Sequence, residues 1–353
     1  MPTRFKWIKR ILVGILLALL FYGLVLLINI SMTYKLTPGI IIDLASGQTT
    51  RLKQSQGRTN ILLLGIGGGM HEGADLTDTI MVASVGLTNK DTVLLSVPRD
   101  IWLTNLKDKI NAAYHIGETK IAGGGLILAK SAVEEVVGIP IHYALLIDFE
   151  GFKQVIDLIG GIDVDVKEAF SDPFYPIAGK ENDLCDGDKE YLCRYETVTF
   201  GLGVEHMDGD RALKYVRSRH AEGDAGTDFS RGRRQQAVML ALKKRLLDKE
   251  IITNIKLLKQ FATALDTATT TDMSLGEVML AGRPFVLNQE QVRTSALIQD
   301  EPEKKITGLL VNPPQWQYDG KWVLIPKHGD FGQIGKYVDC VIENQTNCEE
   351  LVK

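Results

Sequence analysis

The sequence lacks an excess of positive charge and lacks the short motifs of several common enzyme classes. Its 353 residues carry 40 lysines and arginines against 44 aspartates and glutamates, a formal charge of −4. Domains that bind nucleic acid are usually basic, so nucleic acid is not an expected partner. There is no GxSxG segment typical of serine hydrolases, and none of the six histidines lies in an HExxH motif. Serine hydrolase and zinc protease chemistry are therefore not supported.

The N-terminus combines basic residues with an uncharged apolar run. Residues 1–10 are rich in lysine and arginine, and Ile11–Ile30 carries no charge. About twenty apolar residues span a bilayer core, and basic residues before them predict a cytoplasmic N-terminus. We expect a single-pass protein of the cell membrane with its domain outside the cytoplasm. A cleaved signal peptide is the alternative, but the run is long and no small-x-small cleavage site follows.

The few cysteines occur as two local pairs. Cys185 and Cys193 flank one polar segment, and Cys340 and Cys348 flank another. In an exported domain, such pairs indicate disulfides. Zinc binding is the alternative, but neither pair has CxxC spacing and no pair of histidines lies nearby. The sequence therefore predicts two disulfides.

The rest of the chain has the pattern of a layered domain. Residues 31–57 are polar and broken by Pro38 and Gly47, which predicts a stem. Beyond them, near-continuous apolar runs of strand length indicate a sheet buried on both faces. Helical segments alternate with these strands, which favours an α/β domain. The predicted strands are Asn60–Ile66, Thr79–Val85, Thr92–Val97, Tyr143–Phe149 and Ile162–Val166, and predicted helices include Leu126–Val137 and Gly151–Ile159.

Apolar residues of these helices and strands would ordinarily form the core. In a protein tethered to a membrane, however, some of them are candidates to line a channel for a lipid tail. These residues are Leu126, Leu128, Val133, Val136, Val137, Leu145, Ile147, Phe152, Val155 and Ile159.

Residues 206–236 hold a dense pattern of arginine and aspartate. A helix capped by Asp208 is expected to end near Tyr215, so that Arg217 and Arg219 stand two apart in extended chain and face the same way. Arginine forks and helix N-terminal amides together suit phosphate oxygens. The alternative is a set of surface ion pairs, which contribute little stability. The charged residues include Asp208, Asp210, Arg211, Arg217, Arg219, Asp224, Asp228, Arg231, Arg233 and Arg234.

The second half of this stretch predicts another helix. Asp228 is expected to be its N-cap, which places Arg231 and Gln235 one turn apart on one face. Both side chains would then lie near the positive end of the helix dipole, where anions are stabilised.

Further charged residues lie at the ends of predicted strands. Asp78 begins the second strand, Arg99 and Asp100 follow the third in SVPRD, and Lys109 comes shortly after. Charged side chains at strand ends often face a ligand crevice, although an ion pair at the sheet edge is the alternative. A carboxylate such as that of Asp78 is also the ligand type that Mg²⁺ prefers beside phosphate.

The region from about Asn60 to Leu247 resembles the LytR-CpsA-Psr family of cell-envelope proteins. The resemblance implies a three-layer α/β/α domain with a central mixed sheet at 58–300, extended by 301–353. It also implies a membrane-anchored phosphotransferase that moves a glycopolymer from a polyprenyl-pyrophosphate carrier to peptidoglycan. The similar segments, in chain order, are NILLLG, TDTIMV, SVPRD, KINAAY, IDFEGFKQVIDLIGGIDVDV, MDGDRALKYVRSRH and DFSRGRRQQ.

The resemblance also assigns roles to residues. Asp78 would bind Mg²⁺ or another divalent cation. Asp100 and Asp228 would orient the arginines or help to deprotonate the acceptor hydroxyl, and Arg99 and Arg219 would stabilise the negative charge that grows on the leaving polyprenyl phosphate. The implied pyrophosphate ligands are Arg99, Lys109, Arg217, Arg219, Arg231 and Gln235.

Two positions depart from the family pattern. Gly67 stands where members usually have aspartate, and Leu76 stands where they usually have arginine. The first change affects the metal site, for which Asp75, or Glu72 in the same loop, is the candidate substitute ligand. Two other functions stay open: a protein that binds the carrier lipid without turnover, and a pyrophosphatase that uses water as the acceptor.

Overall fold

The computed structural model describes residues 37–47, 49–69, 73–88, 91–221, 223–287, 292–304 and 306–352. These residues form two compact units. The larger unit contains Lys53–Asp272 and Arg283–Lys353, and the smaller one contains the described residues before Lys53 together with Met273–Gly282. The predicted membrane helix, Ile11–Ile30, lies outside the described residues, among which no helix is both long and apolar enough to cross a bilayer.

A short helix, α2 (Pro38–Ser46), lies in the segment that was predicted to be a stem. At its start, the amide of Ile40 donates a 3.4 Å hydrogen bond to the hydroxyl of Thr37, and Gly47 ends it with a φ of 77°. Proline is tolerated in the first helical turn, and glycine readily adopts the left-handed conformation that ends helices. The two residues that suggested chain breaks therefore mark the boundaries of a helix.

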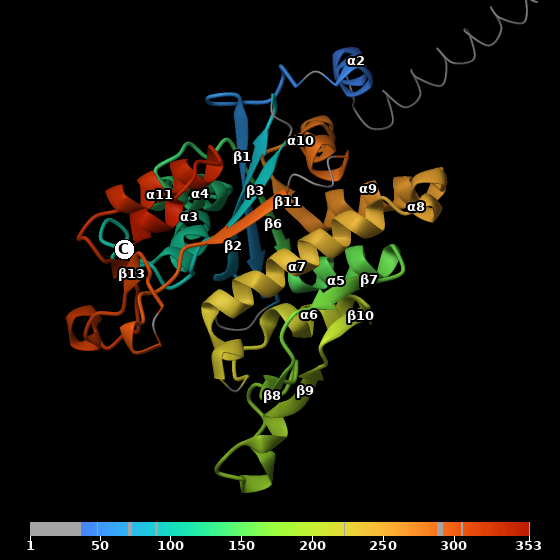
Figure 1. Ribbon diagram of the computed structural model, residues 1–353. Coiled ribbons are helices and arrows are strands. Elements are labelled where there is room, and N and C mark those ends of the chain that lie inside the picture. Colours follow the sequence, from blue (N-terminus) through green and yellow to red (C-terminus); the bar gives the residue numbers. More distant parts are fainter. Residues whose placement is uncertain are drawn as a thin grey trace, which may run out of the picture. The chain divides into compact units, whose positions relative to one another are not determined.

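A mixed sheet forms the centre of the larger unit (Figure 1). In spatial order, its described strands are β11 (Thr269–Thr271), β6 (Tyr143–Asp148), β1 (Arg58–Ile66), β2 (Thr77–Gly86), β3 (Thr92–Ser96) and β12 (Val292–Ala296). β1 pairs in parallel with β6, and β3 with β12, whereas the other neighbours are antiparallel. The predicted central mixed sheet is confirmed.

Helices cover both faces of this sheet (Figure 1). One face carries α3 (Ala113–Lys120), α4 (Gly124–Val137) and α11 (Gly332–Ile342). The other carries α5 (Phe149–Leu158), α6 (Gly209–Arg217), α7 (Asp228–Leu246) and α9 (Ile255–Ala268). The described chain also contains α8 (Lys249–Thr253) and α10 (Leu275–Leu287).

Short two-stranded sheets accompany the central one. The strand predicted at Ile162–Val166 is confirmed, but it belongs to such a pair and not to the central sheet. The pairs of the described chain are β4 (Trp102–Leu103) with β5 (Asp108–Lys109), β7 (Ile162–Val166) with β10 (Gly203–Met207), β8 (Phe170–Pro176) with β9 (Tyr195–Phe200), and β13 (Leu310–Val311) with β14 (Ile325–Pro326).

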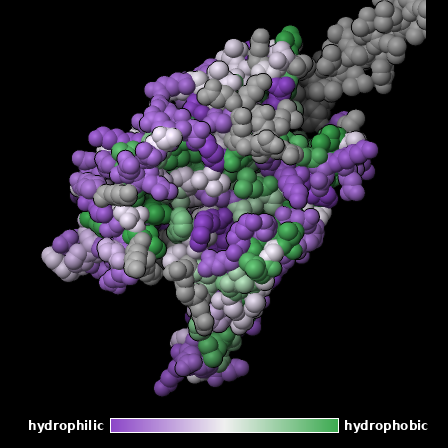
Figure 2. Space-filling view, viewed as in Figure 1, coloured by the Kyte–Doolittle hydropathy of each residue, from purple (hydrophilic) through white to green (hydrophobic). Residues whose placement is uncertain are grey.

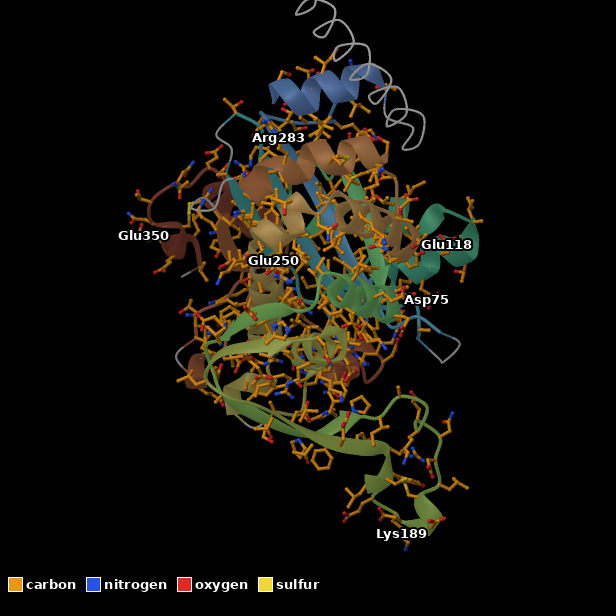
Figure 3. All side chains as sticks on the ribbon, turned by 90° about the vertical axis from the view of Figure 1, so that its right-hand side faces the viewer. Asp75, Glu118, Lys189, Glu250, Arg283 and Glu350 are labelled. Carbon is orange, nitrogen blue, oxygen red and sulfur yellow. A yellow bond between two sulfur atoms is a disulfide. The ribbon has the colours of Figure 1, made fainter. Side chains whose placement is uncertain are left out.

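Both predicted disulfides are formed. The bond between Cys185 and Cys193 closes the excursion between β8 and β9, whose end carries Lys189 (Figure 3). Leu184 is 73% exposed there, and hydrophobic residues are visible at this end of the hairpin in Figure 2. The bond between Cys340 and Cys348 joins the end of α11 to the C-terminal residues.

Candidate functional site

Asp78 lies at the centre of the charged site. Its Oδ1 accepts hydrogen bonds from Nη1 of Arg99 at 2.6 Å and from Nη2 of Arg219 at 2.7 Å. Asp78 stands at the start of β2, and Arg99 follows the end of β3. Because β2 and β3 are antiparallel, the start of one and the end of the other share a sheet edge, where the turn after β3 presents Arg99. Arg219 reaches the same point from the segment after α6.

The charge of Asp78 is fixed by these neighbours. Burial opposes ionisation of the carboxyl, but the charges of Arg219 and Arg99 and their hydrogen bonds outweigh burial and hold the pKa of Asp78 below its ordinary value. The carboxylate therefore balances one of the two guanidinium charges, and the group of three keeps one positive charge for an anionic ligand.

Asp100 holds a second pair of cations. Its Oδ1 accepts a 2.6 Å hydrogen bond from Nζ of Lys109, and its Oδ2 lies 3.3 Å from Nε of Arg99. The side chain of Asp100 is buried, and the β4–β5 pairing of Trp102 with Lys109 brings the lysine back towards it. Both oxygens of Asp100 thus contact cations, which fits the orienting role and not that of a free base.

Arg217 and Arg219 are held by the β8–β9 hairpin. Arg217 is the last residue of α6, although the helix was expected to end near Tyr215, and its guanidinium lies 4.0 Å from the ring centroid of Phe149. It also donates a 3.4 Å hydrogen bond to the hydroxyl of Tyr175. The buried Asp172 accepts the backbone amide of Arg219 at 3.0 Å. Sequence reasoning missed the supports from Asp172 and Tyr175 because they come from a segment that interrupts the α/β pattern.

The start of α7 presents Arg231 and Gln235. The prediction that Asp228 caps this helix is wrong: the hydroxyl of Thr227 accepts the Ser230 amide at 3.2 Å, and Asp228 is the first helical residue. The Asp228 side chain lies outside the described part of the structure. Arg231 is buried, and Gln235 donates a 2.8 Å hydrogen bond to the hydroxyl of Thr79.

Two neighbours on α7 have structural roles that the sequence did not reveal. Arg234 is buried and donates to the backbone carbonyls of Ala225 and Ser218 at 2.6 and 2.5 Å, and burial lowers its pKa to about 10. Gln236 donates to carbonyls of β3 and β12, Leu94 at 3.2 Å and Ser295 at 2.7 Å. Together they fix the loop before α7 and the helix itself against the sheet.

An apolar cavity of about 250 Å³ opens beside these cations, between the sheet and α5, α6 and α7. Leu63 and Leu145 are only half-buried at its wall, whereas their strand neighbours Leu62 and Leu146 are buried on the opposite face. Its polar residues include Asp78, Thr79, Arg217, Arg219, Arg231 and Gln235. The charged groups therefore meet an apolar space that is large enough for part of a hydrocarbon chain.

The residues that were considered for a lipid channel divide between two places. The apolar cavity is lined by Leu145, Ile147, Phe152 and Val155. The opposite face of the sheet packs against Leu126, Val133, Val136 and Val137, with Leu128 beside them, and Ile159 belongs to the core around α6 and α7.

Candidate metal ligands other than Asp78 have other partners. Oδ2 of Asp75 lies 2.6 Å from Nδ1 of His115, beside the helix that carries Glu118 (Figure 3). Within the described residues, the group of three potential ligands is Asp183 with Cys185 and Cys193, and its sulfurs are bonded to each other. Disulfide sulfur offers no thiolate, so this group is not a metal site.

Comparison with known proteins places the chain in a sequence family. The model of the LytR_cpsA_psr family matches residues 38–321. The polyisoprenyl-teichoic acid–peptidoglycan teichoic acid transferase TagU of Enterococcus faecalis is 28% identical over 269 residues, which cover 71% of this chain and 77% of that protein. The enzyme of the same description called TagV, from Bacillus subtilis, is 33% identical over 185 residues, or 51% of this chain and 41% of that protein.

Solved structures share the fold. The crystal structure of Bacillus subtilis TagV superposes with a TM-score of 0.56 at 24% identity, covering 83% of this chain and all of that one. The structure described as TagT bound to LI-WTA gives a TM-score of 0.53 at 22% identity, covering 84% of this chain and 96% of that one.

Proposed function

The chain belongs to the LytR_cpsA_psr family, and from this premise we propose that it transfers a glycopolymer from a polyprenyl diphosphate to peptidoglycan. The names of the related TagU and TagV describe transfer of teichoic acid from a polyisoprenyl carrier to peptidoglycan. The match covers 41% of the TagV relative, so the proposal depends on the site of this chain.

One observation carries the proposal: guanidinium groups from distant segments meet at the polar end of an apolar cavity. Arg99 and Arg219 share Oδ1 of Asp78, and Arg219 also lines the cavity with Arg217 and Arg231. A polyprenyl diphosphate has the same division into a dianionic head and an apolar tail. Arginine suits the head because its planar fork binds phosphate oxygens in pairs.

The reaction would be a displacement at the phosphorus that carries the glycopolymer. The acceptor hydroxyl forms a new bond to this phosphorus, the bond to the bridging oxygen breaks, and polyprenyl phosphate leaves. Such transfers depend mainly on positioning and on stabilisation of negative charge. Arg99, Arg219 and Arg231 would supply that charge, while Lys109, Arg217 and Gln235 would complete the diphosphate site.

The two aspartates proposed to act on the arginines have separate roles. Asp100 is a positioning residue, because Lys109 and Arg99 contact its two oxygens. Asp228 stands at the first turn of α7, one helical turn before Arg231. We assign the proton of the acceptor hydroxyl to Asp228, which leaves Asp100 to hold the cations.

Asp78 is also the proposed ligand of Mg²⁺ or another divalent cation. Its Oδ1 contacts the guanidinium groups, so Oδ2 is the oxygen offered to an ion. Mg²⁺ is commonly held by one or two carboxylates together with substrate phosphates and water, which suits a site with a single carboxylate. The bound ion would neutralise charge on the diphosphate. Asp75 is not assigned to it, because Asp75 pairs with His115.

The membrane location stays part of the proposal. The apolar run Ile11–Ile30, with basic residues before it, supports a single anchor with a cytoplasmic N-terminus. The two disulfides support an oxidising location for the domain, outside the cytoplasm. Carrier lipid and peptidoglycan would both be accessible there.

The full-length protein in detergent provides the test. Polyprenyl-diphosphate-linked glycopolymer and peptidoglycan strands are incubated with it, with and without Mg²⁺. We expect covalent polymer–peptidoglycan and one polyprenyl phosphate per transfer. Diphosphate cleavage with water alone as acceptor would indicate a pyrophosphatase. Tight lipid binding with neither product would indicate a non-catalytic binding protein, and either result would reject the transferase.

A further inference from the structure

A second cavity lies against the same arginines. It has a volume of about 470 Å³ and is lined by Arg99, Arg219 and Arg231, together with Arg233, Phe229 and Trp322. Arg219 and Arg231 therefore line both this cleft and the apolar cavity. If a diphosphate binds between Arg219 and Arg231, its lipid tail can lie in the apolar cavity. The cleft then lies on the other side of the diphosphate.

The wall that carries Trp322 is fixed to the arginine segment by backbone hydrogen bonds. The amide of Leu324 donates to the carbonyl of Asp100 at 2.9 Å, and the amide of Trp102 donates to the carbonyl of Leu324 at 2.8 Å. The segment before Leu324 is therefore held in register with the chain that follows Arg99. Trp322, just beyond the residues matched by the family model, is placed at the cleft by this pairing.

The cleft joins aromatic and cationic side chains. Trp322 and Phe229 are 38% and 40% exposed, although both residues are large and apolar. A pyranose ring has apolar CH faces and a rim of hydroxyl groups, so exposed aromatic rings can cover the faces while polar side chains bind the rim. The lining thus fits a carbohydrate better than it fits a hydrocarbon tail.

The geometry of phosphoryl transfer indicates which carbohydrate the cleft binds. In phosphoryl transfer, the attacking and leaving oxygens lie roughly in line on opposite sides of phosphorus. If the tail of the leaving polyprenyl phosphate occupies the apolar cavity, the attacking hydroxyl approaches from the opposite side of Arg219 and Arg231. We propose that the Trp322 cleft binds the acceptor glycan strand, with Trp322 and Phe229 as its stacking residues. This inference rests on the proposed transferase function.

The acceptor strand in the cleft would react by the transfer step proposed above. The glycan hydroxyl gains a bond to the phosphorus of the glycopolymer, and the diphosphate bond breaks. The electron pair of that bond leaves on polyprenyl phosphate, and the hydroxyl proton passes to the proposed base and then to solvent. Trp322 takes no part in bond making, so its loss should affect acceptor binding and not the donor.

Trp322→Ala tests the proposal in the full-length protein. We expect the KM for peptidoglycan strands to rise about tenfold, a value in the range of one lost aromatic contact, with the KM for the lipid-linked donor unchanged. Trp316→Ala is the matched control, because Trp316 lies in the same C-terminal region, is 79% exposed and lines neither cavity. Trp322→Phe should restore most of the acceptor affinity.

Direct binding of soluble peptidoglycan strands separates the two proposals. If Trp322→Ala weakens strand binding and Trp316→Ala does not, the cleft is supported as the acceptor site. This holds even if no transfer product forms. Product formation with the same acceptor KM in Trp322→Ala and the wild type would overturn the cleft and leave the transferase intact. If Trp322→Ala raises only the KM for the donor, the cleft binds the donor's sugars and the acceptor proposal is overturned. Failure of the strands to bind the wild-type protein would also overturn it.

Discussion

Arg219 lies 141 positions beyond Asp78 in the sequence, and its Nη2 donates a 2.7 Å hydrogen bond to Oδ1 of that aspartate. The bond places a guanidinium from the segment after α6 against the start of β2. It also holds the Arg219 side chain in a defined orientation. Donors held in place in this way contribute more to a charged transition state than donors that must first be ordered.

Arg219→Ala should therefore remove transfer activity without unfolding the domain. The side chain is about one-third exposed, so its loss leaves no large cavity. We expect turnover to fall about 100- to 1,000-fold, as for other preorganised donors. The measurement is the rate of polymer–peptidoglycan formation alongside thermal unfolding. Arg211→Ala is the control, since Arg211 pairs with Glu205 and lines neither cavity; equal rates in both variants would contradict the assignment.

Metal dependence should depend on Asp78. Removal of divalent ions with EDTA is expected to lower transfer by the wild type, and added Mg²⁺ should restore it. Asp78→Asn should be slow at every Mg²⁺ concentration, because a neutral amide is a poor ligand for a hard cation. Asp75→Asn, whose parent residue pairs with His115, should keep the Mg²⁺ response. If Asp75→Asn loses the Mg²⁺ dependence of transfer and Asp78→Asn keeps it, Asp75 and not Asp78 is the metal ligand.

The apolar cavity predicts a dependence on tail length. Leu145→Trp would place a larger ring in the space between β6 and α5, where Leu145 is half-buried. We expect about a tenfold or greater rise in the KM for a long polyprenyl donor, because several buried CH₂ contacts are lost. A donor with a short tail should be nearly unaffected. Equal effects on both donors would show that the tail does not enter this cavity.

Asp91 predicts how stability changes with pH. Its oxygens accept 2.7 Å hydrogen bonds from Arg58 of β1 and Arg293 of β12. Burial alone would raise its pKa, but these bonds and charges outweigh burial and hold the pKa of Asp91 below its ordinary value. Because the native state then binds fewer protons than the unfolded state, this stabilisation is complete above about pH 5 and is lost as pH falls through the native pKa.

Asp91→Asn should accordingly lower the free energy of unfolding by about 1–3 kcal/mol at pH 7. The difference from the wild type should be smaller at pH 3 than at pH 7, because the stabilisation is lost as the pH falls through the lowered native pKa of Asp91. Urea unfolding of both proteins at the two pH values measures it. A difference that is the same at both values would show that the charge of Asp91 is not the cause.

Local patterns were enough for the parts of the fold that depend on neighbouring residues. The strands near Asn60, Thr79 and Thr92 could be predicted from apolar runs, and α4 from helical spacing ended by Gly138, which has a φ of 72°. The disulfides followed from pairs of cysteines that are close in sequence. The arginine-rich site was predictable as a set of residues because its members lie in recognisable short segments.

Contacts between distant segments could not be predicted from the sequence. Nothing near Trp322 indicates that Leu324 pairs with the segment after Arg99. Asp228 was predicted as the N-cap of α7, but Thr227 is the N-cap. The two residues are adjacent and have similar capping preferences, so the sequence does not distinguish them. Arg234 looks like its neighbours in sequence, and only its burial against backbone carbonyls separates it from the proposed ligands.

Protein interiors normally leave few voids larger than a water molecule, yet this domain keeps about 250 Å³ of apolar space beside Leu63 and Leu145. A hydrocarbon chain bound there would contact the apolar side chains of its walls. A ligand that binds only the native chain raises native stability in proportion to the logarithm of its concentration. If the carrier lipid is this ligand, the lifetime of the folded protein is coupled to the supply of the lipid, and cells depleted of it should retain less of the protein.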